Sequence, residues 1–223
     1  MTAPPEDPKL KKVVYAARKA TTPKAIAAWR AVLALDAQNS EAQYKIAAAQ
    51  VAAKQTADAI ATIVALAAST RGDAIEWLIE ARFDAAFAAI RADGKFRTAV
   101  GLDRKASTPY ERFMGLGGTW EQGGTACDKP EVKMTALRDR SLKLRVKTSC
   151  HGSVFDTPFK GTWRLEGDKI VLTFPTRGRQ VTAEDESSCK LEVAGDEDAL
   201  RCRIGRDIEF TVLPARTQFS FSL

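Results

Sequence analysis

Apolar residues recur at helical spacing through the first half of the chain. From about Leu10 to Gly101 the sequence is rich in Ala, Leu, Ile, Lys, Glu and Gln, which favour helices, and it has few internal Gly or Pro residues. Short polar or turn-forming clusters interrupt this region at 21–23, 37–40, 55–56 and 69–72. The pattern predicts helices of about 12 to 16 residues, a length typical of helical hairpins.

The second half instead alternates between apolar and polar residues, as a strand with one buried face does. In the run 142–148, Leu142, Leu144 and Val146 are predicted to face inward, with basic residues between them in solvent. Similar runs occur at 169–174, 200–204, 208–213 and 218–223, with Gly, Asp and Pro in the connections. The spacing predicts about eight to ten antiparallel strands in a closed or nearly closed barrel.

These two patterns predict an α+β protein with two separate domains. A polar connector at 103–109 separates them, and 223 residues suffice for two domains of ordinary size. We predict a linker at residues 1–9, a helical repeat domain at 10–108 and an antiparallel β-barrel at 109–223.

The helical half repeats at an interval of about 34 residues, which is typical of stacked helix pairs. The aligned pairs are Ala25 with Ala59, Ile26 with Ile60, Trp29 with Ile63, Ala31 with Ala65, and Ala47 with Ala81. Small residues at some of these positions would let adjacent helices approach closely, while the large ones fill the space between them.

At these positions the segment resembles the tetratricopeptide repeat family. Ala25, Trp29 and Val32 match the small and bulky positions of the second helix, and 35–39 (Leu-Asp-Ala-Gln-Asn) resembles the Leu-Asp-Pro-x-Asn that ends a repeat. Gln43 departs from the Trp or Leu expected in the next repeat. The resemblance covers residues 6 to about 100, and the run 83–96 resembles the closing helix of such proteins.

The resemblance implies a concave groove that binds a peptide or a helix of a partner protein. Polar residues on the first helix of each pair are the candidates to line it. The predicted groove residues are Tyr15, Lys19, Gln43, Gln50 and Lys54. Alternatively, the helices act only as a spacer or as a dock for the β half.

The tripeptide Gly-Thr-Trp occurs twice in the β half, at 118–120 and 161–163. Glycine permits a bend or a close backbone approach where a strand enters a barrel, and an inward tryptophan can plug one end. The copy at 118–120 resembles the Gly-x-Trp of the lipocalin and wider calycin families, which implies a barrel that holds a hydrophobic ligand. The alternative is an interior filled by bulky side chains and braced by disulfides.

All four cysteines lie in the second half, and none has the Cys-x-x-Cys spacing of a zinc or redox site. They are Cys127, Cys150, Cys189 and Cys202. A hairpin centred on the turn-like stretch 194–197 places Leu191 opposite Leu200, and the same register places Cys189 opposite Cys202. We therefore expect a disulfide between these two cysteines.

The remaining cysteines, Cys127 and Cys150, would then pair across a second hairpin near 138–139. That register requires a bulge near Pro130. Two disulfides would indicate a periplasmic or other extracytoplasmic location. The alternative is four buried free thiols in a cytosolic protein.

The net charge of +6 lies mainly in the helical half. Residues 1–108 contain 16 Lys or Arg residues and 11 Asp or Glu residues. Charges interspersed along helices usually form a solvated face, so nucleic acid is not an expected partner. No stretch approaches the roughly 18 apolar residues of a spanning helix. Residues 1–8 form a Pro-rich polar stretch. We expect that a signal peptide or lipoprotein anchor preceded it. A lipoprotein anchor would attach the protein to a membrane.

The sequence contains few residues that could form a catalytic or metal-binding site. His151 is the single histidine, and we expect it at the surface of a hairpin end. The acidic clusters at 184–186 and 196–198 lie in predicted turns and do not resemble a calcium loop or a catalytic carboxylate pair. Phosphate-binding and hydrolase motifs are absent. We therefore expect no enzymatic activity, no cofactor and no metal.

Together these features favour a non-enzymatic adaptor of the bacterial cell envelope that binds another protein or peptide through the helical groove. The alternative function is a lipocalin-like carrier of a small hydrophobic ligand in the barrel. A third hypothesis is an enzyme inhibitor that presents a disulfide-braced loop.

Overall fold

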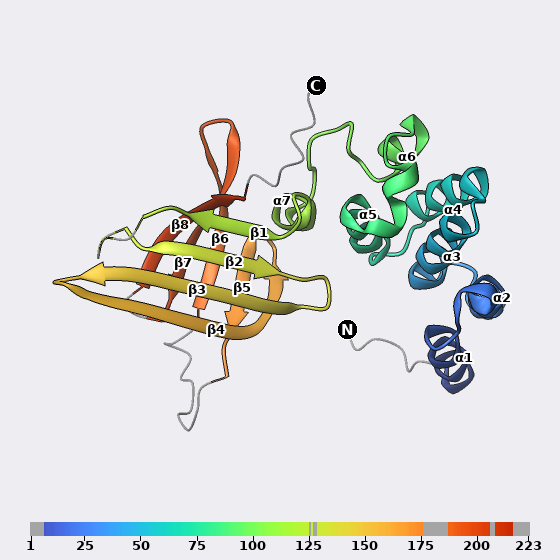
Figure 1. Ribbon diagram of the computed structural model, residues 1–223, viewed down its shortest axis with the longest axis horizontal. Helices are drawn as coiled ribbons and strands as arrows, with labels where there is room; N and C mark the ends of the chain where they lie inside the picture. Colours follow the sequence, from blue (N-terminus) through green and yellow to red (C-terminus); the bar gives the residue numbers. More distant parts are fainter. Residues whose placement is uncertain (1–6, 125, 127–128, 176–186, 206–207, 216–223) are drawn as a thin grey trace. The chain divides into compact units, whose positions relative to one another are not determined.

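The computed structural model describes residues 7–124, 126, 129–175, 187–205 and 208–215 (Figure 1). Its first half is helical and its second half is an antiparallel barrel, consistent with the predicted α+β class. The chain divides into two compact units, residues 1–105 and 106–223. That these units are separately folding domains stays a prediction.

Helices of 10 to 13 residues make up most of the first unit. They are α1 (Pro8–Arg18), α2 (Thr22–Leu33), α3 (Ser40–Ala52), α4 (Thr56–Ala67) and α5 (Ala74–Phe83). Each packs against the next along the chain. Helix α1 begins inside the stretch 1–9 that was expected to be a linker, because the side chain of Asp7 accepts a hydrogen bond from the amide of Lys9 and Pro8 suits the first turn.

Burial in this unit repeats at the interval found in the sequence. Trp29 and the aligned Ile63 are 3% and 0% exposed, and Ala47 and the aligned Ala81 are both fully buried. The alanines remove side-chain volume where helices meet, so their neighbours can pack closely. The closer likeness to tetratricopeptide repeats stays a prediction.

The expected closing helix at 83–96 is instead divided into short pieces. Helix α5 ends at Phe83, and a 3₁₀ helix η1 (Ala85–Ile90) and a short helix α6 (Gly94–Ala99) follow. Asp84 and Asp93 cause the interruptions, because each side chain accepts hydrogen bonds from amides two or three residues later and starts a new helix.

Among the described residues of the second unit, eight strands in sequence order close into a barrel, within the predicted range of eight to ten. They are β1 (Thr119–Gln122), β2 (Glu131–Ala136), β3 (Ser141–Cys150), β4 (Ser153–Glu166), β5 (Lys169–Thr173), β6 (Ser187–Ala194), β7 (Glu197–Ile204) and β8 (Ile208–Pro214). Pairing of β1 with β8 closes the barrel. The strand predicted at 218–223 lies outside the described residues.

Side chains of β3 alternate between the interior and solvent as predicted. Lys143 and Arg145 are exposed, and the buried residues are Leu142, Leu144 and Val146. The hairpin of β6 and β7 also has the predicted register, with Leu191 opposite Leu200. Its connection is only two residues long, and such a short turn fixes which residues face each other.

A short helix, α7 (Pro109–Met114), precedes the barrel where strands were expected. The hydroxyl of Thr108 accepts a hydrogen bond from the amide of Glu111, while the carboxylate of Glu111 accepts one from the amide of Ser107. The residues 108–111 (Thr-Pro-Tyr-Glu) thus carry a sequence signal for a helix start that could have predicted α7.

Within the described residues, no helix is long and apolar enough to cross a membrane.

Candidate functional site

One end of the barrel is plugged by aromatic side chains. Trp120 is 1% exposed, and its indole N–H donates to the carbonyl oxygen of Phe113 in α7 at 3.1 Å. The ring centroid of Phe113 lies 6.0 Å from that of Trp120 and 5.0 Å from that of Trp163. The indole N–H of Trp163 donates to the carbonyl oxygen of Leu137 at 2.9 Å. Both tryptophans of the repeated Gly-Thr-Trp therefore lie inside this end, consistent with the expectation that an inward tryptophan can plug one end of the barrel.

A different group of aromatic residues lies toward the other end of the barrel. Phe159 in β4 pairs with the inward-facing Leu144, and Phe174 follows inward-facing Leu172 by two residues. The ring centroids of Phe159 and Phe174 are 5.4 Å apart, and both side chains are only partly buried. They form a pair of inward-facing rings with access to solvent.

Exposure of the inward side chains rises toward this second end. Ile170 and Leu200 in the middle of the barrel are fully buried, whereas Val146 and Ile204 near the end are 6% and 8% exposed. Phe155, close to the tip of the β3–β4 hairpin, is 57% exposed. This hairpin extends away from α7 in Figure 1. The middle of the barrel is thus filled, and apolar side chains become more exposed toward the end remote from α7.

Gly161 brings the two phenylalanines together. A Cβ atom at this position would lie 2.2 Å from the carbonyl oxygen of Thr173 and 2.8 Å from the ring of Phe174. Only glycine therefore allows the end of β5 to approach β4 so closely. We call Phe155, Phe159 and Phe174 the rim aromatics. Their chemistry suits contact with a small apolar molecule and offers nothing for catalysis.

The helical unit carries a separate groove of about 470 Å³, lined by residues of α1, α2 and α3 and of the turn between α1 and α2. Its walls are mostly alanine, with Trp29 and a salt bridge between Arg18 and Glu41, whose atoms are 2.6 Å apart. Lys45 adds a second basic side chain. Small side chains leave the room for this groove, which is shallow and partly charged.

The five predicted groove residues lie elsewhere on the helical unit. Tyr15 is 60% exposed on α1, with the ammonium group of Lys19 4.1 Å from its ring centroid. Lys54 is exposed in the turn after α3. Gln50 is 5% exposed and accepts a hydrogen bond from Thr62, so it faces α4 instead of the expected solvent. Gln43 is partly buried, and its amide donates to the carbonyl oxygen of Ala37 at 3.5 Å.

Cys189 and Cys202 form the predicted disulfide, facing each other across β6 and β7. The other expected pair includes Cys127, which lies outside the described residues, so a disulfide with Cys150 stays a prediction. One disulfide is compatible with an extracytoplasmic location.

His151 is exposed in the turn between β3 and β4, where a surface position was expected. The acidic cluster at 184–186 lies outside the described residues. In the part of the chain that is described, no group of three or more His, Cys, Asp or Glu residues could hold a metal ion. That the protein lacks enzymatic activity stays a prediction.

No family model, curated protein or solved structure matches the chain. The closed barrel of eight antiparallel strands is consistent with the lipocalin-like arrangement that the Gly-Thr-Trp motif implied.

The sequence-based choice of site residues missed the rim aromatics. A usable signal was present, because the stretch 153–160 places aromatic and apolar residues on both faces of β4, where a strand with one wet face would alternate. The contact between Phe159 and Phe174 had no such signal, since it depends on the close approach at Gly161.

Proposed function

We propose that the protein is a lipocalin-like carrier that holds a small hydrophobic ligand at the end of the barrel remote from α7. The observation that carries this proposal is the contact between Phe159 and Phe174, two inward-facing rings that are only partly buried. A ligand that covered these rings would remove apolar surface from water, which contributes about 25 cal/mol per Å². No catalytic group is needed for this function.

The packing of the barrel limits what such a ligand can be. Ile170, Leu200 and Met134 fill the middle of the interior and are fully buried. The ligand therefore rests on the rim aromatics and does not penetrate to Trp120. A compact apolar molecule, or one end of a fatty acid, meets this requirement.

Replacement of both Phe159 and Phe174 by Ala is expected to weaken binding of a fluorescent fatty-acid analogue by about tenfold or more, because each ring provides contact area to the ligand. Fluorescence titration of the full chain measures the affinity and the stoichiometry. The unchanged protein is expected to bind one molecule saturably.

The matched control is Leu213→Ala, since Leu213 is 41% exposed on the outer face of β8. This variant should bind the analogue as the unchanged protein does. Equal weakening in both variants, or non-saturable binding by the unchanged protein, would refute the carrier proposal. Circular dichroism spectra of all three proteins establish that the barrel is folded.

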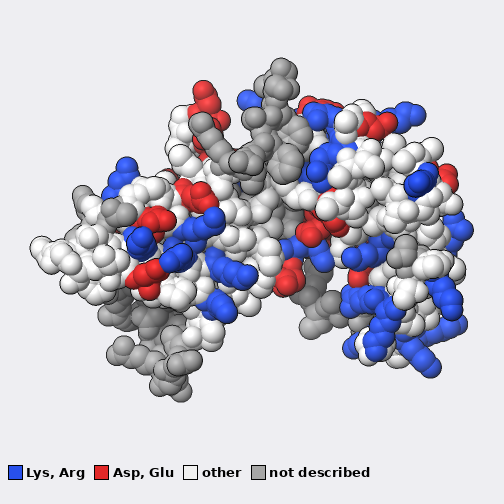
Figure 2. Space-filling view, in the orientation of Figure 1, with Lys and Arg blue, Asp and Glu red and all other residues white. Residues whose placement is uncertain are grey.

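A second candidate function is an adaptor of the bacterial cell envelope, and the groove between α1, α2 and α3 favours it. Basic residues surround this part of the helical unit, and neither α1 nor α2 contains an acidic residue. Figure 2 shows Lys and Arg side chains gathered over these helices. The helical basic residues are Lys9, Lys11, Lys12, Arg18, Lys24 and Arg30. The charge favours a partner segment with acidic residues beside an apolar face.

For the adaptor function, Lys45→Glu is expected to weaken binding of a synthetic acidic amphipathic helical peptide by about fivefold or more, because it reverses a charge in the groove. The control is Lys95→Glu, which changes an exposed residue of α6 by the same charge. Fluorescence anisotropy with a labelled peptide measures both affinities. Equal weakening by the two variants would mean that only the net charge matters, and the groove would then lose its support.

A further inference from the structure

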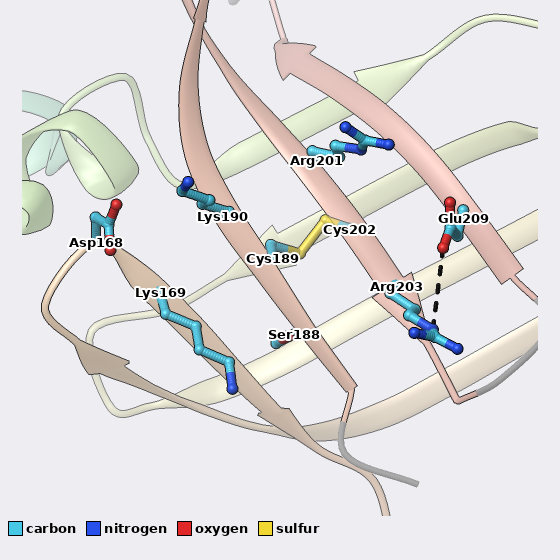
Figure 3. A pocket seen from close by; sticks show the side chains of 9 residues that line it. All are labelled: Asp168, Lys169, Ser188, Cys189, Lys190, Arg201, Cys202, Arg203 and Glu209. Carbon is cyan, nitrogen blue, oxygen red and sulfur yellow. Dashed lines mark ion pairs between the residues drawn. A yellow bond between two sulfur atoms is a disulfide. The ribbon is translucent and has the colours of Figure 1, made fainter. Parts of the chain in front are cut away.

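The outer face of β5, β6 and β7 carries a pocket of about 400 Å³ with a mainly basic lining. Its charged residues are Lys169, Lys190, Arg201, Arg203, Asp168 and Glu209. Figure 3 shows the four basic side chains arranged around the middle of the pocket, with the two carboxylates on opposite sides. The pocket lies on the outside of the barrel and is distinct from the rim aromatics.

The strand register places three of these basic residues side by side. Lys169 pairs with Lys190 across β5 and β6, and Lys190 pairs with Arg201 across β6 and β7. Arg203 follows Arg201 by two residues and therefore points to the same face. Like charges directly opposite each other destabilise a sheet, so this arrangement costs stability when nothing is bound.

Three basic residues on the outer face of β2 and β3, in contrast, lie beside carboxylates. Lys133 pairs with Glu121 at 3.0 Å, and Lys147 lies 3.9 Å from Glu131. Arg145 forms two hydrogen bonds with Asp156, and the side-chain hydrogen bond from Arg145 holds the pKa of the Asp156 carboxyl below its ordinary value. Each of these cations has a carboxylate partner.

In the pocket, two cations that face each other lack such a partner among the residues that the structure describes. Within the described residues, neither Lys190 nor Arg201 forms an ion pair. Arg203 and Glu209 form an ion pair at 4.0 Å, which is drawn as a dashed line in Figure 3. With four basic and two acidic residues, the lining has an excess of positive charge that an anionic ligand would neutralise.

The spacing of the cations indicates how many anionic groups the ligand has. Adjacent strands are about 4.8 Å apart, so three cations abreast span roughly 10 Å. A ligand with anionic groups distributed over this span can contact all three cations at once. We propose that this pocket binds a ligand that carries two or more phosphate or sulfate groups. Lysine and arginine both suit such groups, and arginine can donate two parallel hydrogen bonds to one of them.

The test compares the Lys190→Ala, Arg201→Ala double variant with the unchanged full chain by calorimetric titration of tripolyphosphate at low salt. The unchanged protein is expected to bind tripolyphosphate one to one and at least about tenfold more tightly than inorganic phosphate. The double variant is expected to lose about tenfold or more of this affinity, because charge-assisted hydrogen bonds are lost. It should fold normally, since the change removes two cations that face each other.

The matched control is the double variant Lys143→Ala, Lys160→Ala. These two residues also face each other, across β3 and β4, but they lie outside the pocket. This control removes the same charge and should change the affinity by less than about threefold. Equal loss in both double variants, or no preference of the unchanged protein for tripolyphosphate, would overturn the proposal.

Phosphatidylcholine vesicles with added phosphatidylglycerol identify the source of the anionic groups. If the unchanged protein and the control variant sediment with these vesicles and the Lys190→Ala, Arg201→Ala variant does not, the site is supported and its phosphates belong to a lipid surface. Tripolyphosphate binding without sedimentation would support the site with a soluble ligand. If the Lys190→Ala, Arg201→Ala variant still sediments with the vesicles as the unchanged protein does, or still binds tripolyphosphate with unchanged affinity, the result counts against the proposed site.

Discussion

Trp120→Ala is expected to lower the free energy of unfolding of the barrel by about 3 to 5 kcal/mol, the usual cost of removing a buried tryptophan side chain. Trp120 is 1% exposed, stacks on Phe113 and donates a hydrogen bond to its carbonyl oxygen. The substitution leaves a cavity between α7 and the barrel and also leaves that carbonyl without its donor. Both effects act on the same end of the barrel.

Hydrogen exchange, followed by mass spectrometry on peptides from β2 and β3, measures the change in the free energy of unfolding of the barrel without a contribution from the helical unit. Exchange through unfolding of the barrel should accelerate by at least about a hundredfold. Trp120→Phe keeps an aromatic ring in place and should cost much less. Leu116→Ala, at a side chain that is 54% exposed, should have little effect. A loss below about 1 kcal/mol for Trp120→Ala would mean that the aromatic plug does not hold the barrel together.

Replacement of Cys189 and Cys202 together by Ala is expected to lower the free energy of unfolding by about 3 kcal/mol. The disulfide joins residues 13 positions apart, and closing a loop of that size restricts the unfolded chain by about this amount. Both cysteines are buried at 1% exposure, so the folded barrel keeps the bond away from water. Urea unfolding monitored by circular dichroism measures the difference in free energy.

Dithiothreitol supplies the control for this prediction. The reductant should destabilise the unchanged protein at least as much as the double substitution does. Any further destabilisation of the double variant by dithiothreitol would belong to Cys127 and Cys150, and would support the second predicted disulfide. If the double variant were as stable as the unchanged protein, the bond would contribute nothing to the barrel.

The pairing of Cys189 with Cys202 was predictable because all of the information is local. A two-residue turn at Gly195 and Asp196 joins β6 to β7, and the register of a hairpin follows from its turn. The glycine has a φ angle of 65°, which suits such a turn. Alternation along β3 was predictable for a similar reason, since a buried face requires apolar residues at every second position.

The position of Gln50 was not predictable from the local pattern of residues. Its polarity suggested a solvent-facing position on the first helix of a pair, but its amide oxygen lies 2.9 Å from the hydroxyl of Thr62 on α4. A buried polar group is stable when a neighbouring element supplies a hydrogen-bond partner. Periodicity within α3 cannot indicate which polar residue will have one.

By itself, the sequence determined that the first half is helical and the second half stranded, the alternation of inward and outward residues in β3, and the partner of Cys189. These features depend on contacts between residues that are close in the chain or joined by one short turn. Only the tertiary structure decided that Phe174 meets Phe159, that Lys169, Lys190 and Arg201 stand abreast, and that α7 plugs the barrel with Phe113. These contacts depend on the register of several strands at once and on the closure of the barrel, which the periodicity of any single segment does not specify.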